Sequence, residues 1–144
     1  MRKGLAFLIL SIVFVAGFGL GNVLRPTPVA AQMGGRVFEL RTYTASEGKL
    51  DALHARFRDH TLRIFQKHGM TNVGYWSPQD APLAQNTLIY ILAHSSREAA
   101  KKSWDAFRQD PDWQKAQKES EVNGRLTTKV ESVFMNATDY SPMK

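Results

Sequence analysis

The stretch VFELRTYTASEGKL, residues Val37 to Leu50, changes its hydrophobic period partway along. Up to Thr44, apolar and polar side chains alternate, which is the period-two pattern of a half-buried strand. Beyond it the apolar residues recur every three or four positions, which is typical of an amphipathic helix. We therefore predict a strand over residues 36–44 and a helix directly after it.

The predicted helix runs from about Glu47 to His68. The segment Thr44–Glu47 has the spacing of a capping box, and Ser46 is an alternative cap. At the other end, Gly69 suits the left-handed conformation that ends many helices.

The remaining elements follow the same periodicities and give the order β-α-β-β-α-β. A capping box at Ser95–Glu98 starts a second helix that ends near Gln109, and Asp110–Pro111 starts a further helix. Strand 87–94 is the most apolar and should be central. The full set comprises strands at 36–44, 71–77, 87–94 and 126–138 and helices at 47–68, from the Ser95 cap to about 109, and at 111–122. This order predicts an α+β, ferredoxin-like fold with a four-stranded antiparallel sheet and helices on one face.

The face of that sheet without helices needs a cover. Trp76, Tyr90 and Leu92 would otherwise form a large exposed apolar patch. A second copy of the same sheet is the simplest cover, so we expect a homodimer in which two sheets form an α/β barrel.

The N-terminal segment is typical of a secretory signal peptide. A basic start precedes an apolar run at residues 5–24, and small residues lead to a cleavage point after Ala31. The alternative is an uncleaved membrane anchor through residues 5–24. Cleavage would leave one domain, residues 36–138, in an exported protein that is periplasmic or secreted. The chain has no cysteine, so it must fold without disulfides.

Nucleic acid is not an expected partner. The formal net charge is +6, but the leader contains Arg2, Lys3 and Arg25 and no acidic residue, which leaves +3 for the domain. The longest basic pair of the domain is Lys101–Lys102, too short for a phosphate-binding run.

Several short motifs in order resemble the NIPSNAP family: FELRTYT, EGKLDAL, HGMTNVGYWSP, LIYILAH and WDAFRQDPDWQKA. The resemblance extends over residues 37–136. It implies a dimeric α/β barrel related in architecture to antibiotic-biosynthesis monooxygenases. It implies no particular reaction, and the export leader departs from the mitochondrial or cytosolic setting of many members.

Glu39, Arg41 and Tyr43 share one face of the first strand. If Phe38 and Leu40 pack beneath the helices, this trio faces the dimer cleft, where Trp76, Tyr90 and His94 can join it. The six candidate ligand-binding residues are Glu39, Arg41, Tyr43, Trp76, Tyr90 and His94, and the candidate catalytic residues are Tyr43 and His94. The plainer interpretation is that Glu39 and Arg41 form an ion pair and that the aromatic residues are interface core.

Neither a metal nor another cofactor is expected. The four histidines, His54, His60, His68 and His94, lack the three- or four-residue spacing that places two ligands side by side on a helix. The chain contains no HExxH, no GxSxG and no glycine-rich phosphate loop.

Three functions remain open from the sequence. The leading one is binding of a small molecule or a partner in the cleft of the homodimer. The second is a cofactor-independent monooxygenase- or isomerase-like enzyme. The third is a dimeric scaffold whose cleft is filled by its own side chains.

Overall fold

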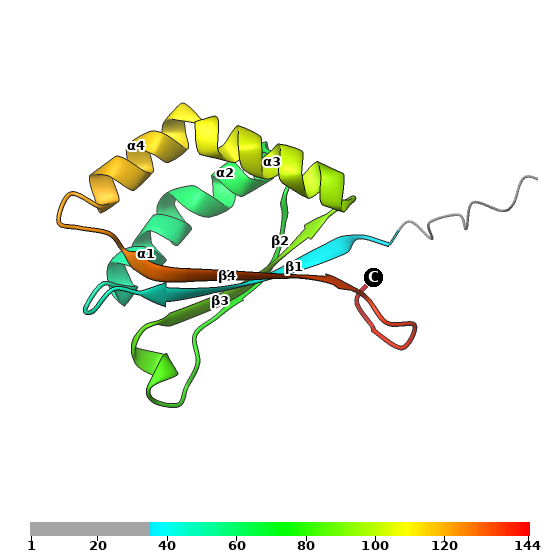
Figure 1. The fold of residues 1–144 in the computed structure, drawn as a ribbon, viewed down its shortest axis with the longest axis horizontal. Coiled ribbons are helices and arrows are strands. Elements are labelled where there is room, and N and C mark those ends of the chain that lie inside the picture. The colour runs from blue at the N-terminus through cyan, green and yellow to red at the C-terminus, as the bar shows by residue number, and fades with distance from the viewer. Residues whose placement is uncertain (1–34) are drawn as a thin grey trace, which may run out of the picture. The chain divides into compact units, whose positions relative to one another are not determined.

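Helices cover one face of a four-stranded antiparallel sheet in the computed structural model, which describes residues 35–144 (Figure 1). The expected leader and its cleavage point lie outside these residues. Within them, none of the helices has the length and apolar character needed to cross a membrane.

The order of elements agrees with the β-α-β-β-α-β prediction. The strands are β1 (Val37–Ala45), β2 (Thr71–Trp76), β3 (Thr87–His94) and β4 (Thr127–Asn136). The helical segments are α1 (Leu50–Arg56), η1 (Phe57–Thr61), α2 (Leu62–Lys67), η2 (Leu83–Gln85), α3 (Arg97–Gln109) and α4 (Pro111–Ser120). The sheet order is β2-β3-β1-β4, with every neighbouring pair antiparallel. The ferredoxin-like fold is thus confirmed, and β3 is central as predicted.

The strand register decides which side chains lie under the helices. Glu39 is opposite Leu92, and Tyr43 is opposite Leu88. Leu88 and Leu92 belong to the buried core, so the odd-numbered positions of β1 face the helices.

The other face has no helix over it and carries mostly apolar side chains. Leu40 lies opposite Ile91 and Val133, and Trp76 lies opposite Ile89. Trp76 is 50% exposed and Val133 is 55% exposed. We call this surface the open face.

The first helix differs from the prediction at its start. The capping box at Thr44–Glu47 is not used, because Thr44 is still part of β1. The alternative cap, Ser46, instead donates its hydroxyl to the carbonyl of Arg125 at 2.7 Å. The helix begins at Leu50, after a turn in which Gly48 has a φ of 68°. The segments α1, η1 and α2 then follow without a break, and η1 is a single π-helical turn.

The other two helix starts were predicted more accurately. The Ser96 hydroxyl accepts the backbone N–H of Ala99 at 3.0 Å, one residue later in the chain than the predicted cap. Asp110 caps α4 by accepting the N–H of Asp112 at 2.8 Å, and Pro111 is the first helical residue.

Aromatic rings fill the core between the helices and the sheet. Tyr90, on β3, is fully buried, and its ring lies 5.2 Å from Phe57 and 6.0 Å from Phe65 between centroids. Tyr43 and Tyr75 complete the contacts around it at 5.3 Å each. This cluster anchors the helices to the sheet and defines one end of the helix-covered face.

Candidate functional site

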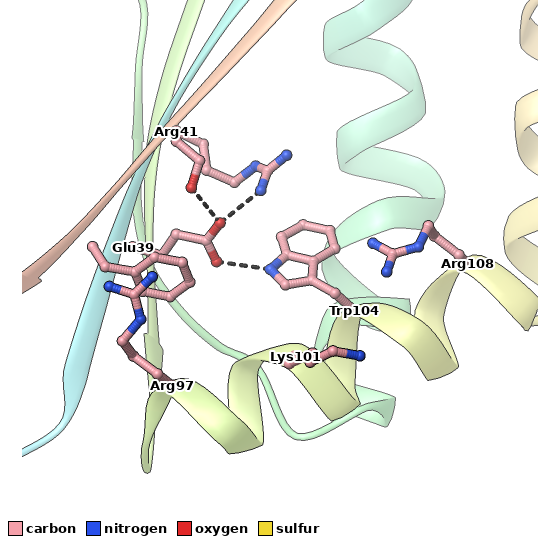
Figure 2. A pocket seen from close by; sticks show the side chains of 8 residues that line it. Glu39, Arg41, Arg97, Lys101, Trp104 and Arg108 are labelled. Atoms are coloured by element: carbon pink, nitrogen blue, oxygen red, sulfur yellow. Dashed lines mark hydrogen bonds and ion pairs between the residues drawn. The ribbon is translucent and has the colours of Figure 1, made fainter.

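A buried carboxylate, that of Glu39, lies between β1 and α3 at the other end of this face. Its side chain is 1% exposed, and four side chains from four different elements contact its two oxygens. Arg41 Nη1 and Ser132 Oγ lie 2.6 and 2.7 Å from Oε1, and Trp104 Nε1 and His94 Nε2 lie 2.7 and 3.0 Å from Oε2. Figure 2 shows Arg41 and Trp104 converging on this carboxylate.

These contacts keep Glu39 ionised. Burial alone would raise its pKa, but hydrogen bonds from His94, Trp104 and Ser132 and the charge of Arg41 outweigh burial. The pKa of Glu39 is therefore lowered from 4.5 to about 2. The carboxylate is a fixed negative charge at any physiological pH.

The hydrogen bonds also assign the tautomer of His94. Its Nε2 lies against the Glu39 carboxylate, which can only accept, so Nε2 carries the proton. Its Nδ1 is buried and has no partner among the described residues.

The Arg41 guanidinium is held by aromatic rings as well as by Glu39. Its central carbon lies 4.2 Å from the centroid of the Trp104 ring and 5.5 Å from that of Tyr43. Such stacking orients the planar guanidinium, which can also donate in a fork. Its Nε is buried without a partner among the described residues.

A hollow of about 470 Å³ opens beside the Glu39 carboxylate. Its size is in the range of small-molecule sites. The lining residues come from β1, α3 and β4 and are Glu39, Arg41, Arg97, Lys101, Trp104, Arg108, Ser132 and Phe134 (Figure 2). We call this the Glu39 hollow.

Helix α3 supplies half of that lining from a single stripe. Arg97, Lys101, Trp104 and Arg108 are spaced by four, three and four residues, so they lie on one side of the helix. The Arg97 guanidinium packs on the Phe134 ring of β4 at 4.3 Å. The hollow is therefore rich in cations and has aromatic walls.

The structure brings together only some of the predicted site residues. Glu39 and Arg41 line the hollow. His94 contacts the Glu39 carboxylate but does not line the hollow. Tyr43 and Tyr90 belong to the aromatic core. The Tyr90 hydroxyl is buried without a partner among the described residues, and burial raises its pKa well above 10.

The predicted orientation of the first strand was wrong. We expected Glu39, Arg41 and Tyr43 to point away from the helices, and they point towards them. Trp76 lies on the open face as expected, but Tyr90, expected beside it, is buried in the core beneath the helices. Alternation shows which residues share a face, but both faces of β1 carry large apolar or aromatic groups, so it does not show which face is covered.

Sequence reasoning missed six of the eight lining residues. They are Arg97, Lys101, Trp104, Arg108, Ser132 and Phe134. The signal that could have found them is the α3 stripe, because an indole flanked by three cations on one side of a helix is not a typical core pattern. Trp104 was interpreted as core, and it does pack against the core while its N–H contacts Glu39.

The histidines lie apart from one another. His68 contacts Asp110 at 2.6 Å, and His54 contacts Ser77 at 3.2 Å. Among residues 35–144, no three histidine, aspartate or glutamate side chains are grouped so that they could hold a metal ion.

The sheet order and the helices on one face define a ferredoxin-like α+β domain, and solved structures share this fold. One is a NIPSNAP family protein with unknown function from Agrobacterium tumefaciens, 23% identical, at a TM-score of 0.67 over 78% of this chain and 96% of that one. The sequence model of the NIPSNAP family matches residues 38–142, so the chain belongs to the NIPSNAP family.

Two more distant structures have the same architecture. SnoaB, a cofactor-independent oxygenase from Streptomyces nogalater, is 13% identical at a TM-score of 0.50, over 75% of this chain and 98% of that one. A dimeric ferredoxin-like protein from an uncultured marine organism is 9% identical at a TM-score of 0.53, over 76% and 94%. No curated protein matches the chain in sequence.

Proposed function

We propose that this chain binds a small molecule in the Glu39 hollow. The observation that carries the proposal is a buried, ionised carboxylate whose four donors converge from separate elements at the wall of an open hollow. Keeping a charge buried and fully hydrogen-bonded is costly in a fold of this size, and such arrangements concentrate at functional sites.

The hollow favours binding over the two alternatives. A scaffold needs no open space of its own, whereas a hollow of about 470 Å³ is open on the helix-covered face. For an enzyme, Tyr43 and His94 would need contact with a substrate, but neither lines the hollow.

A thermal-shift screen of the full-length chain against a broad metabolite library tests this proposal. Bound ligand raises the melting temperature through linkage. We expect at least one compound whose stabilisation is reduced in Trp104→Phe, which loses the N–H to Glu39, and is retained in Trp113→Phe. Trp113 is the matched control because it packs on Phe107, away from the hollow. If no compound stabilises the chain, or if both variants keep the full shift, the hollow is not the binding site.

We also propose that two copies pair through their open faces. The exposed Trp76 and Val133, with Leu40, Ile89 and Ile91, form an apolar surface of the kind that marks an interface. The marine protein of the same fold is described as dimeric, which supports pairing of two copies.

Sedimentation of charge variants tests the dimer. Val133→Asp places a carboxylate on the open face and should give a monomer at micromolar concentration, where the unaltered chain is a dimer. Val122→Asp is the control, because Val122 is 78% exposed and follows α4, outside the sheet. A monomeric unaltered chain would contradict the proposal.

Finally, we propose that the protein is exported and cleaved after Ala31, on the basis of its apolar N-terminal run and small-residue exit. Intact mass measurement on protein expressed in a bacterium with a periplasm tests this directly. A mature chain beginning at Gln32 in the periplasmic fraction supports it, and an uncut chain in the membrane fraction supports the anchor.

A further inference from the structure

The Glu39 carboxylate has no free capacity to bind a ligand donor. A carboxylate offers about four acceptor positions, and Arg41, Ser132, Trp104 and His94 occupy them. A cationic or amide-bearing ligand would have to displace one of these donors. The negative charge of Glu39 is thus already neutralised by Arg41 and by the other three donors of the protein.

The three cations that α3 contributes to the hollow have weaker partners than Arg41 has. Arg97 forms no ion pair with any of residues 35–144, and it is held by its contact with the Phe134 ring at 4.3 Å. Lys101 and Arg108 share a single partner, Asp105, at 2.7 and 2.5 Å. That carboxylate does not line the hollow, and its side chain is 42% exposed. Exposed pairs of this kind are weak, so these cations remain available.

The aromatic walls give the hollow an apolar surface beside its positive charge. The rings of Trp104 and Phe134 are only partly buried and both line it. A ligand would therefore meet ring surface beside positive charge, and Arg97 is positioned on one of these rings before any ligand arrives. A guanidinium fixed in this way matches the planar oxygens of a carboxylate or the oxygens of a phosphate.

We infer that the ligand is a small organic anion, a carboxylate or a phosphate ester. Its charged group contacts Arg97 and Lys101, and its apolar part lies against Phe134 and Trp104. This inference rests on the proposed function of the Glu39 hollow and names the chemical class of its ligand.

Four probes of similar shape and different charge test the inference by calorimetric titration of the full-length chain. They are benzoate, phenyl phosphate, benzamide and benzylamine. We expect one or both anions to bind about tenfold or more tightly than the neutral and cationic probes. The anion that binds more tightly shows whether the charged group of the ligand is a carboxylate or a phosphate. Raising the salt from about 50 mM to about 500 mM should weaken anion binding, because ions screen exposed charges.

A pair of double variants locates the binding. Arg97→Gln with Lys101→Gln removes two charges from the hollow and should reduce anion affinity about tenfold or more. Arg58→Gln with Lys102→Gln removes the same charge from exposed positions outside the hollow and should leave the affinity within about twofold. Circular dichroism of both confirms that they fold alike.

Several results would overturn the inference. They are benzamide or benzylamine binding as tightly as the anions, an equal loss in both double variants, or no binding by any of the four probes. The library screen separates this failure from that of the proposed function. If a neutral compound stabilises the chain and this stabilisation is reduced in Trp104→Phe, the hollow binds ligands but is not an anion site. If no compound does so, both proposals fail.

Discussion

Two carboxylates are buried, that of Glu39 beneath α3 and that of Asp110 at the junction of α3 and α4, and their surroundings are alike at first sight. Each contacts an imidazole, His94 at 3.0 Å for Glu39 and His68 at 2.6 Å for Asp110. Each also contacts a cation, Arg41 in one case and Lys67 in the other. Both have a pKa below the ordinary value.

The two carboxylates differ in the origin of their donors. One Asp110 oxygen accepts the backbone N–H of Asp112, so this residue starts α4 and ties it to the end of α2. Within residues 35–144, Glu39 accepts only from side chains, and it lies beside an open hollow. A buried carboxylate with a histidine partner is thus no sign of a site by itself. Convergence of side chains from separate elements onto a carboxylate beside a hollow is the stronger sign.

Removing the Glu39 carboxylate should have the largest effect on stability. Glu39→Ala leaves Arg41 as a partly buried, unpaired charge and leaves His94, Trp104 and Ser132 without their acceptor. We expect the free energy of unfolding to fall by about 3–5 kcal/mol. Urea denaturation of the full-length chain measures this, with Glu47→Ala, an exposed carboxylate in the turn before α1, as control. A loss below about 1 kcal/mol would mean that the Glu39 network contributes little.

The same contribution should depend on pH. The pKa of Glu39 is lowered from 4.5 to about 2 in the folded chain, so ionised Glu39 stabilises the fold above pH 4.5 and loses this effect as the pH falls towards about 2. The difference in unfolding free energy between the unaltered chain and Glu39→Gln should therefore be constant near neutrality and shrink below about pH 4.5. A difference that stays constant down to pH 2.5 would exclude the lowered pKa.

Asp110→Ala should cost less than Glu39→Ala, about 2 kcal/mol, because the main loss is an N-cap. Asp110→Asn keeps an acceptor for the N–H of Asp112 and should lose less still. Neither variant should change the affinity of benzoate or phenyl phosphate. A change in probe affinity as large as that of the Arg97 and Lys101 double variant would remove the distinction between the two carboxylates.

The smallest expected effect belongs to Lys67→Met. Lys67 is 49% exposed, so its pair with Asp110 is solvated, and His68 and the Asp112 N–H remain in place. Chemical denaturation should give a smaller loss than Asp110→Ala. An equal loss would show that the ion pair, and not the helix cap, is the main role of Asp110.

The sequence contained enough information to predict the fold. Strand and helix periods gave the element order, and Asp110–Pro111 was predicted to start α4, where it caps the helix. The start of the first helix was missed because Ser46 hydrogen-bonds to Arg125, a contact across 79 residues that local spacing cannot reveal.

The candidate site was predicted only in part, for a physical reason. Glu39 and Arg41 were found because they alternate on one strand, where neighbours in space are two apart in sequence. The α3 stripe joins them only through tertiary packing, as Trp104 and Glu39 are 65 residues apart. The orientation of β1 also depends on packing, since both of its faces carry large apolar or aromatic side chains.

The claim that the Glu39 hollow is a binding site is tested most directly by the three tryptophan indole N–H signals in a nitrogen-15 NMR titration. Trp104 lies in the hollow, Trp76 on the open face and Trp113 against Phe107. Titration with benzoate or phenyl phosphate should move the Trp104 signal saturably and leave the other two in place. Saturable binding that moves Trp76 or Trp113 and not Trp104, or no saturable change at all, would contradict the account.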